Sequence, residues 1–184
     1  MKRAVFFDLQ GTLGGEPLGD ILGFSFYPMA KEAVAFAKRS GLLVFIVTNQ
    51  SHISDGVLTM GQFNRRMSAI ISEIEDAGGA VDEVYCCPHR RAEGCICKKP
   101  SPYFLQMAAE KYGLTLDNCY VVGDIGRSDM LMAYHTGAKG VLVRTGEGET
   151  SLTTGRQYWQ QYTPAYIASD VNDAVKWIIS DISK

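Results

Sequence analysis

The chain has 184 residues, of which 46% are hydrophobic and 21% charged, and its formal net charge is −2 at pH 7. A chain of this length is most simply one globular domain, and the small net charge excludes a basic surface for nucleic acid or anionic lipid. No apolar stretch is long enough to span a bilayer, and Asp8 interrupts the first apolar run too early for a signal peptide. We therefore expect a cytoplasmic protein with small-molecule partners, present as a monomer or weak homodimer.

Short apolar runs alternate along the chain with helix-like patterns. This alternation predicts βαβ units and an α/β fold, in which helices cover a mainly parallel sheet in a three-layer, Rossmann-like arrangement. The expected strands are Ala4–Phe7, Leu42–Val47, Val81–Cys86, Tyr120–Val122 and Val141–Val143.

Helix signals lie between and after these strands. The clearest helix begins at Thr59, where Thr59 and Gln62 form a capping-box pattern, and it ends before Gly78. We interpret its apolar stripe as core, and the stripe consists of Phe63, Met67, Ile70, Ile71 and Ile74. The other expected helices are Met29–Arg39, a segment from Ser101 to Gly113, Asp129–Thr136 and Asp170–Ile182.

A carboxylate follows the first expected strand. Ala4–Phe7 runs directly into Asp8, and the next residues, Leu9-Gln10-Gly11-Thr12, include a glycine that is typical of a turn. Open α/β sheets bind ligands at the carboxyl ends of their strands, so Asp8 is a candidate functional residue. Taken alone, the same pattern also fits an aspartate in an ordinary strand-to-loop turn.

Polar residues also follow the second and fourth strands. Thr48 and Asn49 continue the second strand, while Asp124 follows the fourth and Asp129 begins the next expected helix. Hydroxyl and amide groups suit phosphate oxygens, and grouped carboxylates suit Mg²⁺, which prefers oxygen ligands. The alternatives are a polar turn for Thr48 and Asn49 and helix capping for Asp129.

Lys98 and Lys99 precede the third helix, close to the expected sheet edge. A lysine there would supply positive charge opposite the carboxylates and stabilise an anionic phosphate group. The alternative is a solvated lysine pair.

Three thiols and one imidazole lie in the short segment just before these lysines. Cys87, His89, Cys95 and Cys97 are four nitrogen and sulfur ligands within residues 86–98, a spacing that is typical of a closed, structural Zn²⁺ site. We expect this zinc loop to position the lysines that follow it. The remaining cysteines, Cys86 and Cys119, are expected to be buried thiols.

Together these motifs resemble the haloacid dehalogenase (HAD) superfamily of aspartyl-phosphate enzymes, and within it the small zinc-loop phosphatases that act on heptose bisphosphate or histidinol phosphate. The resemblance covers most of the chain and implies a Mg²⁺-dependent phosphatase without a large cap domain, acting on a small phosphorylated metabolite. It implies that Asp8 is the nucleophile and a Mg²⁺ ligand and that the backbone carbonyl of Gln10 also binds the metal. Asp124 would be the remaining protein ligand, and Asp129 would lie just outside the set of metal ligands.

The resemblance also assigns the other site residues. Thr48 would bind the transferring phosphoryl group and Lys99 would stabilise its charge. Asn49 and Lys98 would contact the substrate, Lys98 at a position where the heptose enzymes carry an arginine. The structural zinc ligands would be Cys87, His89, Cys95 and Cys97.

The chain departs from the family at Gln10, where the family carries a second aspartate that protonates the leaving oxygen and later activates water. A neutral amide does not exchange protons usefully near pH 7, so the sequence predicts a slow enzyme, with roughly 10²–10⁴-fold of acid–base assistance missing. A binding or regulatory protein that keeps the phosphate site is the alternative function. Haloacid dehalogenation is a third, less favoured, because Asp124 and the zinc loop are retained.

Further departures concern the substrate. Residues 14–19 do not match the sugar-binding loop of the heptose enzymes, and Ile125 stands where they carry a lysine. The late segment is rich in aromatic residues, which we interpret as packing against the core or a second subunit rather than as a substrate lid: Tyr158, Trp159, Tyr162 and Tyr166. His52 and His135 have no evident partners and are expected to be surface or local structural residues.

Overall fold

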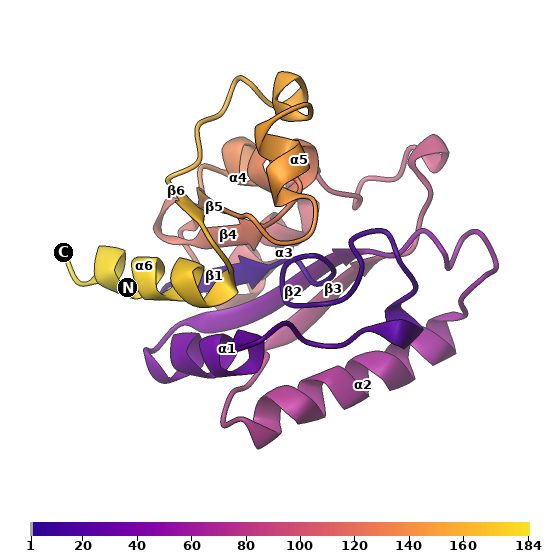
Figure 1. The fold of residues 1–184 in the computed structure, drawn as a ribbon, viewed down its shortest axis with the longest axis horizontal. Helices are drawn as coiled ribbons and strands as arrows, with labels where there is room; N and C mark the ends of the chain where they lie inside the picture. The colour runs from indigo at the N-terminus through magenta and orange to yellow at the C-terminus, as the bar shows by residue number, and fades with distance from the viewer. Residues whose placement is uncertain (1) are drawn as a thin grey trace.

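The computed structural model of the protein describes residues 2–184, and a six-stranded parallel sheet forms its centre (Figure 1). The strand order is β3-β2-β1-β4-β5-β6, with every neighbouring pair parallel. The α/β fold predicted from the sequence is therefore confirmed. The strands are β1 (Ala4–Phe7), β2 (Leu43–Asn49), β3 (Glu83–Cys87), β4 (Tyr120–Gly123), β5 (Lys139–Val143) and β6 (Tyr166–Ala168).

Helices cover both faces of this sheet. The α-helices are α1 (Ala30–Arg39), α2 (Met60–Asp76), α3 (Tyr103–Tyr112), α4 (Leu131–Thr136), α5 (Gly148–Leu152) and α6 (Val171–Ile182). Successive strand residues point to opposite faces, so Val5 and Phe7 pack with α1, α2 and α6, while Phe6 packs with α3 and α4. The resulting three layers explain why the strands read as continuous apolar runs.

The capping box of α2 forms as predicted. The Thr59 hydroxyl accepts a hydrogen bond from the Gln62 backbone N–H at 3.2 Å, and the Gln62 side chain accepts one from the Thr59 N–H at 2.9 Å. The apolar stripe of this helix is buried, except that Ile71 is only half-buried.

Some sequence-based boundaries were wrong. The prediction omitted β6, which has only three residues and a half-exposed pattern at the edge of the sheet. Asp129 does not begin an α-helix but lies within a turn of π-helix, Gly126–Met130, that precedes α4. Helix α3 begins at Tyr103, after Pro102 rather than Ser101. Of the two cysteines expected to be buried thiols, Cys119 is buried but Cys86 is only half-buried.

The aromatic segment packs mainly against the protein's own core. Trp159 is fully buried and its indole N–H donates to the Ser151 carbonyl at 3.0 Å, while the Tyr162 hydroxyl accepts from the Gly140 N–H at 2.7 Å. Tyr166 stacks on Trp177 with ring centroids 5.1 Å apart. Tyr158 differs from these residues because 59% of its surface is exposed.

His135 is exposed, and its Nδ1 lies 3.1 Å from the Pro100 carbonyl oxygen, as expected of a local structural residue. His52 is partly exposed. Within residues 2–184, none of the helices combines the length and the apolar character that crossing a membrane requires.

Candidate active site

The predicted site residues meet at the carboxyl ends of three central strands. Asp8 directly follows β1, Thr48 is the penultimate residue of β2, and Asp124 directly follows β4. The Asp8 backbone N–H donates to the Val122 carbonyl at 2.9 Å, which joins the β1 and β4 ends. All of these side chains are buried or nearly so. The side chains that the sequence placed at one edge of the sheet therefore lie together there.

Lys99 lies between two carboxylates. Its Nζ is 2.5 Å from Asp8 Oδ1 and 2.8 Å from Asp129 Oδ1, and the side chain is almost completely buried. Burial alone would lower the pKa of Lys99, but the charges of Asp129 and Asp8 outweigh burial and raise that pKa above its usual range. The lysine is therefore a permanently charged group within the site and not a solvated side chain.

Three carboxylates, those of Asp8, Asp124 and Asp129, bring oxygen atoms within 4.8 Å of one another. Burial, followed by the charges of Asp8 and Asp129, raises the pKa of Asp124 well above its usual range. Burial also raises the pKa of Asp129 to about 6, although Lys99 opposes this change. One lysine does not neutralise three carboxylates, so the group has the oxygen ligands and the excess negative charge that suit a divalent cation.

Asp124 is held rigidly by its surroundings. The Thr12 hydroxyl donates to its Oδ1 at 3.2 Å and the Glu147 backbone N–H donates to its Oδ2 at 2.8 Å. Gly11 and Gly146 both have positive φ, and an added Cβ atom at either would lie 2.2 or 2.3 Å from Asp124 Oδ2. Glycine is therefore required at both positions for the loops to enclose this carboxylate.

Asp129 has the capping interaction that the sequence analysis considered, together with a second role. Its Oδ2 accepts a hydrogen bond from the Ile125 N–H at 3.0 Å, at the start of the π-helical turn, while its Oδ1 pairs with Lys99. Both oxygens are thus engaged by the protein, which places Asp129 behind Asp8 and Asp124 as a support for the lysine.

The Gln10 side chain is fully hydrogen-bonded. Its Nε2 donates to the backbone carbonyls of Glu16 at 3.1 Å and Gly19 at 2.8 Å, and its Oε1 accepts from Gln50 Nε2 at 2.8 Å. Gln50 also donates to the Thr48 hydroxyl at 2.9 Å. The amide of Gln10 therefore connects the β1 loop both to residues 16–19 and to the end of β2.

A cavity of about 200 Å³ opens above Asp8. Its wall includes the six residues proposed from the sequence for catalysis or substrate contact: Asp8, Gln10, Thr48, Asn49, Lys98 and Lys99. The Asn49 side chain accepts from the Lys99 backbone N–H at 3.1 Å, and Lys98 Nζ donates to the His89 carbonyl at 2.9 Å. These contacts hold the two lysine positions against the ends of β2 and β3.

Sequence reasoning assigned no role to four residues of this region. Thr12 belongs to the loop that follows β1, and Gln50 directly follows the last residue of β2, so their nearness to strand ends was the available signal. Arg91 and Arg127 also line the cavity, from the segment after β3 and from the π-helical turn. No periodic pattern marks these two arginines, because each comes from an irregular segment.

The Cys/His cluster forms beside the end of β3. Cys87 Sγ and Cys95 Sγ are 3.6 Å apart, Cys95 Sγ and Cys97 Sγ are 3.7 Å apart, and His89 Nδ1 lies 3.4 Å from Cys97 Sγ. In a tetrahedral site with Zn–S bonds of about 2.3 Å, sulfur atoms lie about 3.8 Å apart. The four side chains therefore have the donor atoms and the spacing to hold one metal ion.

The amino-acid sequence is similar to those of known phosphatases. The family model described as HAD-hydrolase-like matches residues 96–174. The D-glycero-beta-D-manno-heptose-1,7-bisphosphate 7-phosphatase of Pseudomonas putida is 37% identical over 70% of this chain and 73% of its own length. The enzyme of the same name from Pasteurella multocida is 33% identical over 80% of this chain and 84% of its own length. The chain belongs to this family of HAD-like phosphatases.

Solved structures show the same fold. The D,D-heptose 1,7-bisphosphate phosphatase of B. bronchiseptica, complexed with magnesium and phosphate, superposes with a TM-score of 0.87 at 24% identity, over 98% of this chain and 99% of that one. The corresponding phosphatase of Burkholderia thailandensis gives a TM-score of 0.73 at 23% identity, with full coverage of both chains. The relatives in Pseudomonas putida and Pasteurella multocida confirm the resemblance inferred from the motifs and the assignment to the hydrolases of phosphate esters.

Proposed function

We propose that the protein is a Mg²⁺-dependent phosphomonoester hydrolase that forms an aspartyl phosphate on Asp8. The observation that carries this proposal is the ion pair between Lys99 and Asp8 in a cavity that Thr48 also lines. A carboxylate at the floor of a cavity, beside a fixed cation, is placed to attack an anionic phosphoryl group. Membership of the HAD-like phosphatases supports the same assignment.

Mg²⁺ would be held by the side chains of Asp8 and Asp124, with the backbone carbonyl of Gln10 as the third protein ligand. When bound, the ion neutralises charge on the phosphoryl oxygens and orients them for displacement. Asp129 would orient Lys99, since its Oδ1 contacts the lysine Nζ at 2.8 Å. The B. bronchiseptica relative of the same fold holds magnesium and phosphate, which supports this choice of ion.

The reaction would proceed in two displacements at phosphorus. In the first, an Asp8 oxygen bonds to phosphorus while the bond from phosphorus to the ester oxygen breaks, and Lys99 and Thr48 contact the phosphoryl oxygens. In the second, water attacks the aspartyl phosphate, which releases inorganic phosphate and restores the carboxylate. The protein supplies the nucleophile, the fixed positive charge and the orientation of the phosphoryl group.

Gln10 leaves this scheme without a proton donor for the leaving oxygen. Both hydrogens of its amide are already donated to the backbone carbonyls of Glu16 and Gly19. Alkoxide leaving groups would therefore depart unprotonated, and we expect turnover roughly 10²–10⁴-fold below that of an enzyme with an acid at this position. Acidic leaving groups would be least affected.

The substrate class that we propose is a sugar phosphate or bisphosphate. The names of the relatives in Pseudomonas putida and Pasteurella multocida support this class. Ile125 and residues 14–19 differ from the pattern of the heptose enzymes, so we propose the class of sugar phosphates and not one particular heptose.

We further propose that Zn²⁺ occupies the cluster of Cys87, His89, Cys95 and Cys97 and has a structural role. The cluster is followed immediately by Lys98 and Lys99. Four N and S ligands complete a tetrahedral shell and exclude a catalytic water. The zinc would then fix the chain segment that delivers Lys99 to Asp8.

A phosphate-release assay with Mg²⁺ tests the proposed activity. The chain, Asp8→Asn and Gln10→Asp would be compared on sugar, amino-alcohol, aryl and acyl phosphates. We expect release by the chain that disappears in Asp8→Asn. No release from any ester, by a folded chain that contains zinc, would overturn the proposal.

A binding or regulatory protein is the second candidate, and the hydrogen bonds of Gln10 favour it because they occupy the position of the missing acid. In that case phosphorylated ligands with Mg²⁺ would raise the melting temperature while no phosphate is released. Activity that appears only in Gln10→Asp would support this candidate.

A further inference from the structure

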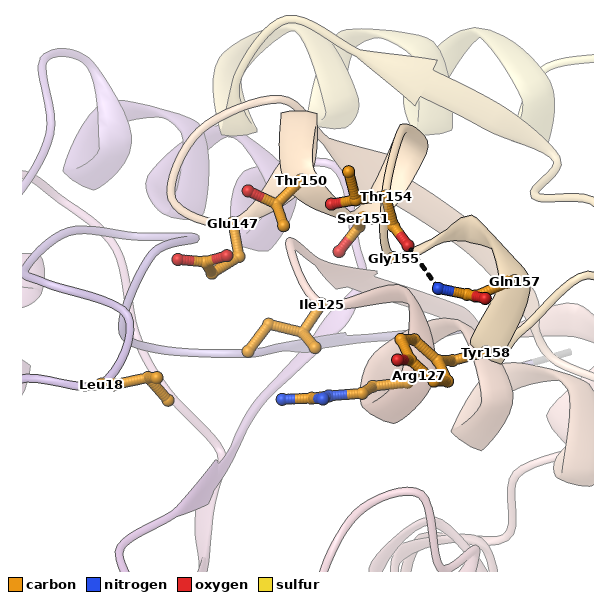
Figure 2. A pocket seen from close by; sticks show the side chains of 10 residues that line it. All are labelled: Leu18, Ile125, Arg127, Glu147, Thr150, Ser151, Thr154, Gly155, Gln157 and Tyr158. Atoms are coloured by element: carbon orange, nitrogen blue, oxygen red, sulfur yellow. Dashed lines mark hydrogen bonds between the residues drawn. The ribbon is translucent and has the colours of Figure 1, made fainter.

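Figure 2 shows a second cavity, which has a volume of about 310 Å³. Leu18, Ile125 and Arg127 line both cavities, so the two spaces adjoin along a common wall. Ile125 directly follows Asp124, which places this wall within one residue of the carboxylate cluster. The volume falls in the range of small-molecule sites, roughly 300–1,000 Å³.

The second cavity combines an apolar surface with hydrogen-bonding groups. Figure 2 shows Ile125 between Leu18 on one side and Tyr158 on the other. Tyr158 and Leu18 are 59% and 75% exposed, although most large apolar side chains of this protein are buried. The exposed ring of Tyr158 and the aliphatic side chains of Leu18 and Ile125 provide apolar surface for the face of a ring-shaped ligand.

Charged groups without protein partners complete the lining. Within residues 2–184, neither Arg127 nor Glu147 forms a salt bridge, and neither side chain donates or accepts a hydrogen bond. The hydroxyl-bearing residues Thr150 and Thr154 line the same space. Glu147 can accept hydrogen bonds from ligand hydroxyls, and Arg127 can donate to ligand oxygens.

Hydrogen bonds from Gln10, which lines the cavity above Asp8, hold one part of the wall that the two cavities share. Gln10 donates to the carbonyls of Glu16 and Gly19, which flank the segment that carries Leu18. On the opposite side, Tyr158 follows the Gly155 turn and precedes the fully buried Trp159. Both edges of the second cavity are therefore joined, through their chain neighbours, to hydrogen-bonded or buried residues.

We propose that this second cavity binds the polyhydroxylated ring of a sugar phosphate whose phosphoryl group lies above Asp8. The ring would place one face on Tyr158 and Ile125 and direct its hydroxyls toward Glu147 and Arg127. This inference rests on the proposed function and adds to it a cyclic leaving group and the residues that select it.

Calorimetric binding to the Asp8→Asn protein, with zinc and Mg²⁺ present, tests the inference without turnover. The probes are the 6-phosphates of glucose, mannose and galactose, with acyclic glucitol 6-phosphate, glycerol 3-phosphate and inorganic phosphate for comparison. At least one cyclic sugar phosphate should bind about tenfold more tightly than both acyclic esters, a difference that corresponds to about 1.4 kcal/mol.

Substitutions then locate the ring. Tyr158→Ala and Glu147→Gln should each weaken binding of that sugar phosphate about three- to tenfold and leave the affinity for inorganic phosphate unchanged. Tyr134→Ala is the matched control, since Tyr134 is 49% exposed and lines neither cavity. Sugar phosphates that bind no better than glycerol 3-phosphate, or that are insensitive to both substitutions, would overturn the inference.

The two failures are distinguishable. Binding of inorganic phosphate with no preference for a ring would refute the second cavity as a sugar site and leave the proposed phosphatase intact. Absence of phosphate release by the unmodified chain would count against the proposed function, whatever the binding data show.

Discussion

Gly123 packs directly against Asp129: a Cβ atom added to Gly123 would lie only 2.3 Å from Asp129 Cγ. Asp129 in turn supports Lys99 by an ion pair of 2.8 Å. The absence of a side chain at the last residue of β4 therefore leaves room for Asp129, one of the two carboxylates that pair with Lys99.

We expect Gly123→Ala to displace Asp129 and thereby to reduce phosphatase activity at least tenfold, because Lys99 would lose its support. Steady-state phosphate release measures the change. Gly23→Ala is the control, since no atom lies within 4 Å of a Cβ at Gly23 and its φ is not positive. Equal activity of both variants would show that the Gly123 contact does not position the lysine.

Lys99→Met should abolish activity and also destabilise the fold. The substitution leaves Asp8 and Asp129 buried without their cation, and removal of one partner from a buried pair typically costs about 3–5 kcal/mol. Urea unfolding with and without Mg²⁺ checks this expectation. Mg²⁺ should recover part of the loss, because a cation would again balance the carboxylates. An unfolding free energy within about 0.5 kcal/mol of the parent would refute it.

Gln10→Asp should increase hydrolysis of alkyl phosphates far more than that of aryl phosphates. An aspartate at this position can protonate a poor leaving group, whereas aryl oxygens depart without assistance. We expect a gain of about 10²-fold for glycerol phosphate and little change for 4-nitrophenyl phosphate. Equal gains for both esters would show that protonation of the leaving group is not what the chain lacks.

The same substitution should loosen residues 14–19. An aspartate is one methylene shorter than glutamine and cannot donate to the carbonyls of Glu16 and Gly19. Hydrogen exchange of the backbone amides in this segment should therefore be faster in Gln10→Asp than in the parent chain. Gln10→Glu separates the two causes, because it also lacks the amide donor but keeps the length of the side chain.

Loss of the proposed zinc site should lower both stability and activity. Cys97→Ser should reduce the zinc content from one ion per chain to near zero, lower the melting temperature, and reduce activity by displacing Lys98 and Lys99. Elemental analysis and thermal unfolding measure these changes. Cys86→Ser is the matched control, because Cys86 adjoins the cluster and is not one of its members. Full zinc content in Cys97→Ser would remove Cys97 from the ligand set.

Sequence reasoning succeeded for residues whose position in the fold follows from the direction of the parallel strands. Asp8, Thr48 and Asp124 lie at or directly after strand ends, and parallel strands bring such residues to one edge. The cluster of cysteines was equally accessible, since its members lie within a short segment. These parts required only the alternation of apolar runs and the spacing of polar residues.

The features that escaped prediction depend on tertiary contacts. Strand β6 has three residues, too few for a period to be visible. Arg127 lines the site from a π-helical turn, and no local sequence pattern predicts such a turn. The partners of the Gln10 amide nitrogen are backbone carbonyls, so their identity depends on how residues 16–19 fold back. Sequence indicated that Gln10 was unusual, but only the structure shows what its amide binds.

The common wall of the two cavities, formed by Leu18, Ile125 and Arg127, has a consequence for inhibitor design. A phosphate mimic alone would address groups that many phosphatases share. A compound that joins such a mimic to a ring of the second cavity would hold each half near its own subsite at a high effective concentration. Selectivity would then come from contacts with the residues of the second cavity, and potency from the covalent link between the two halves of the compound.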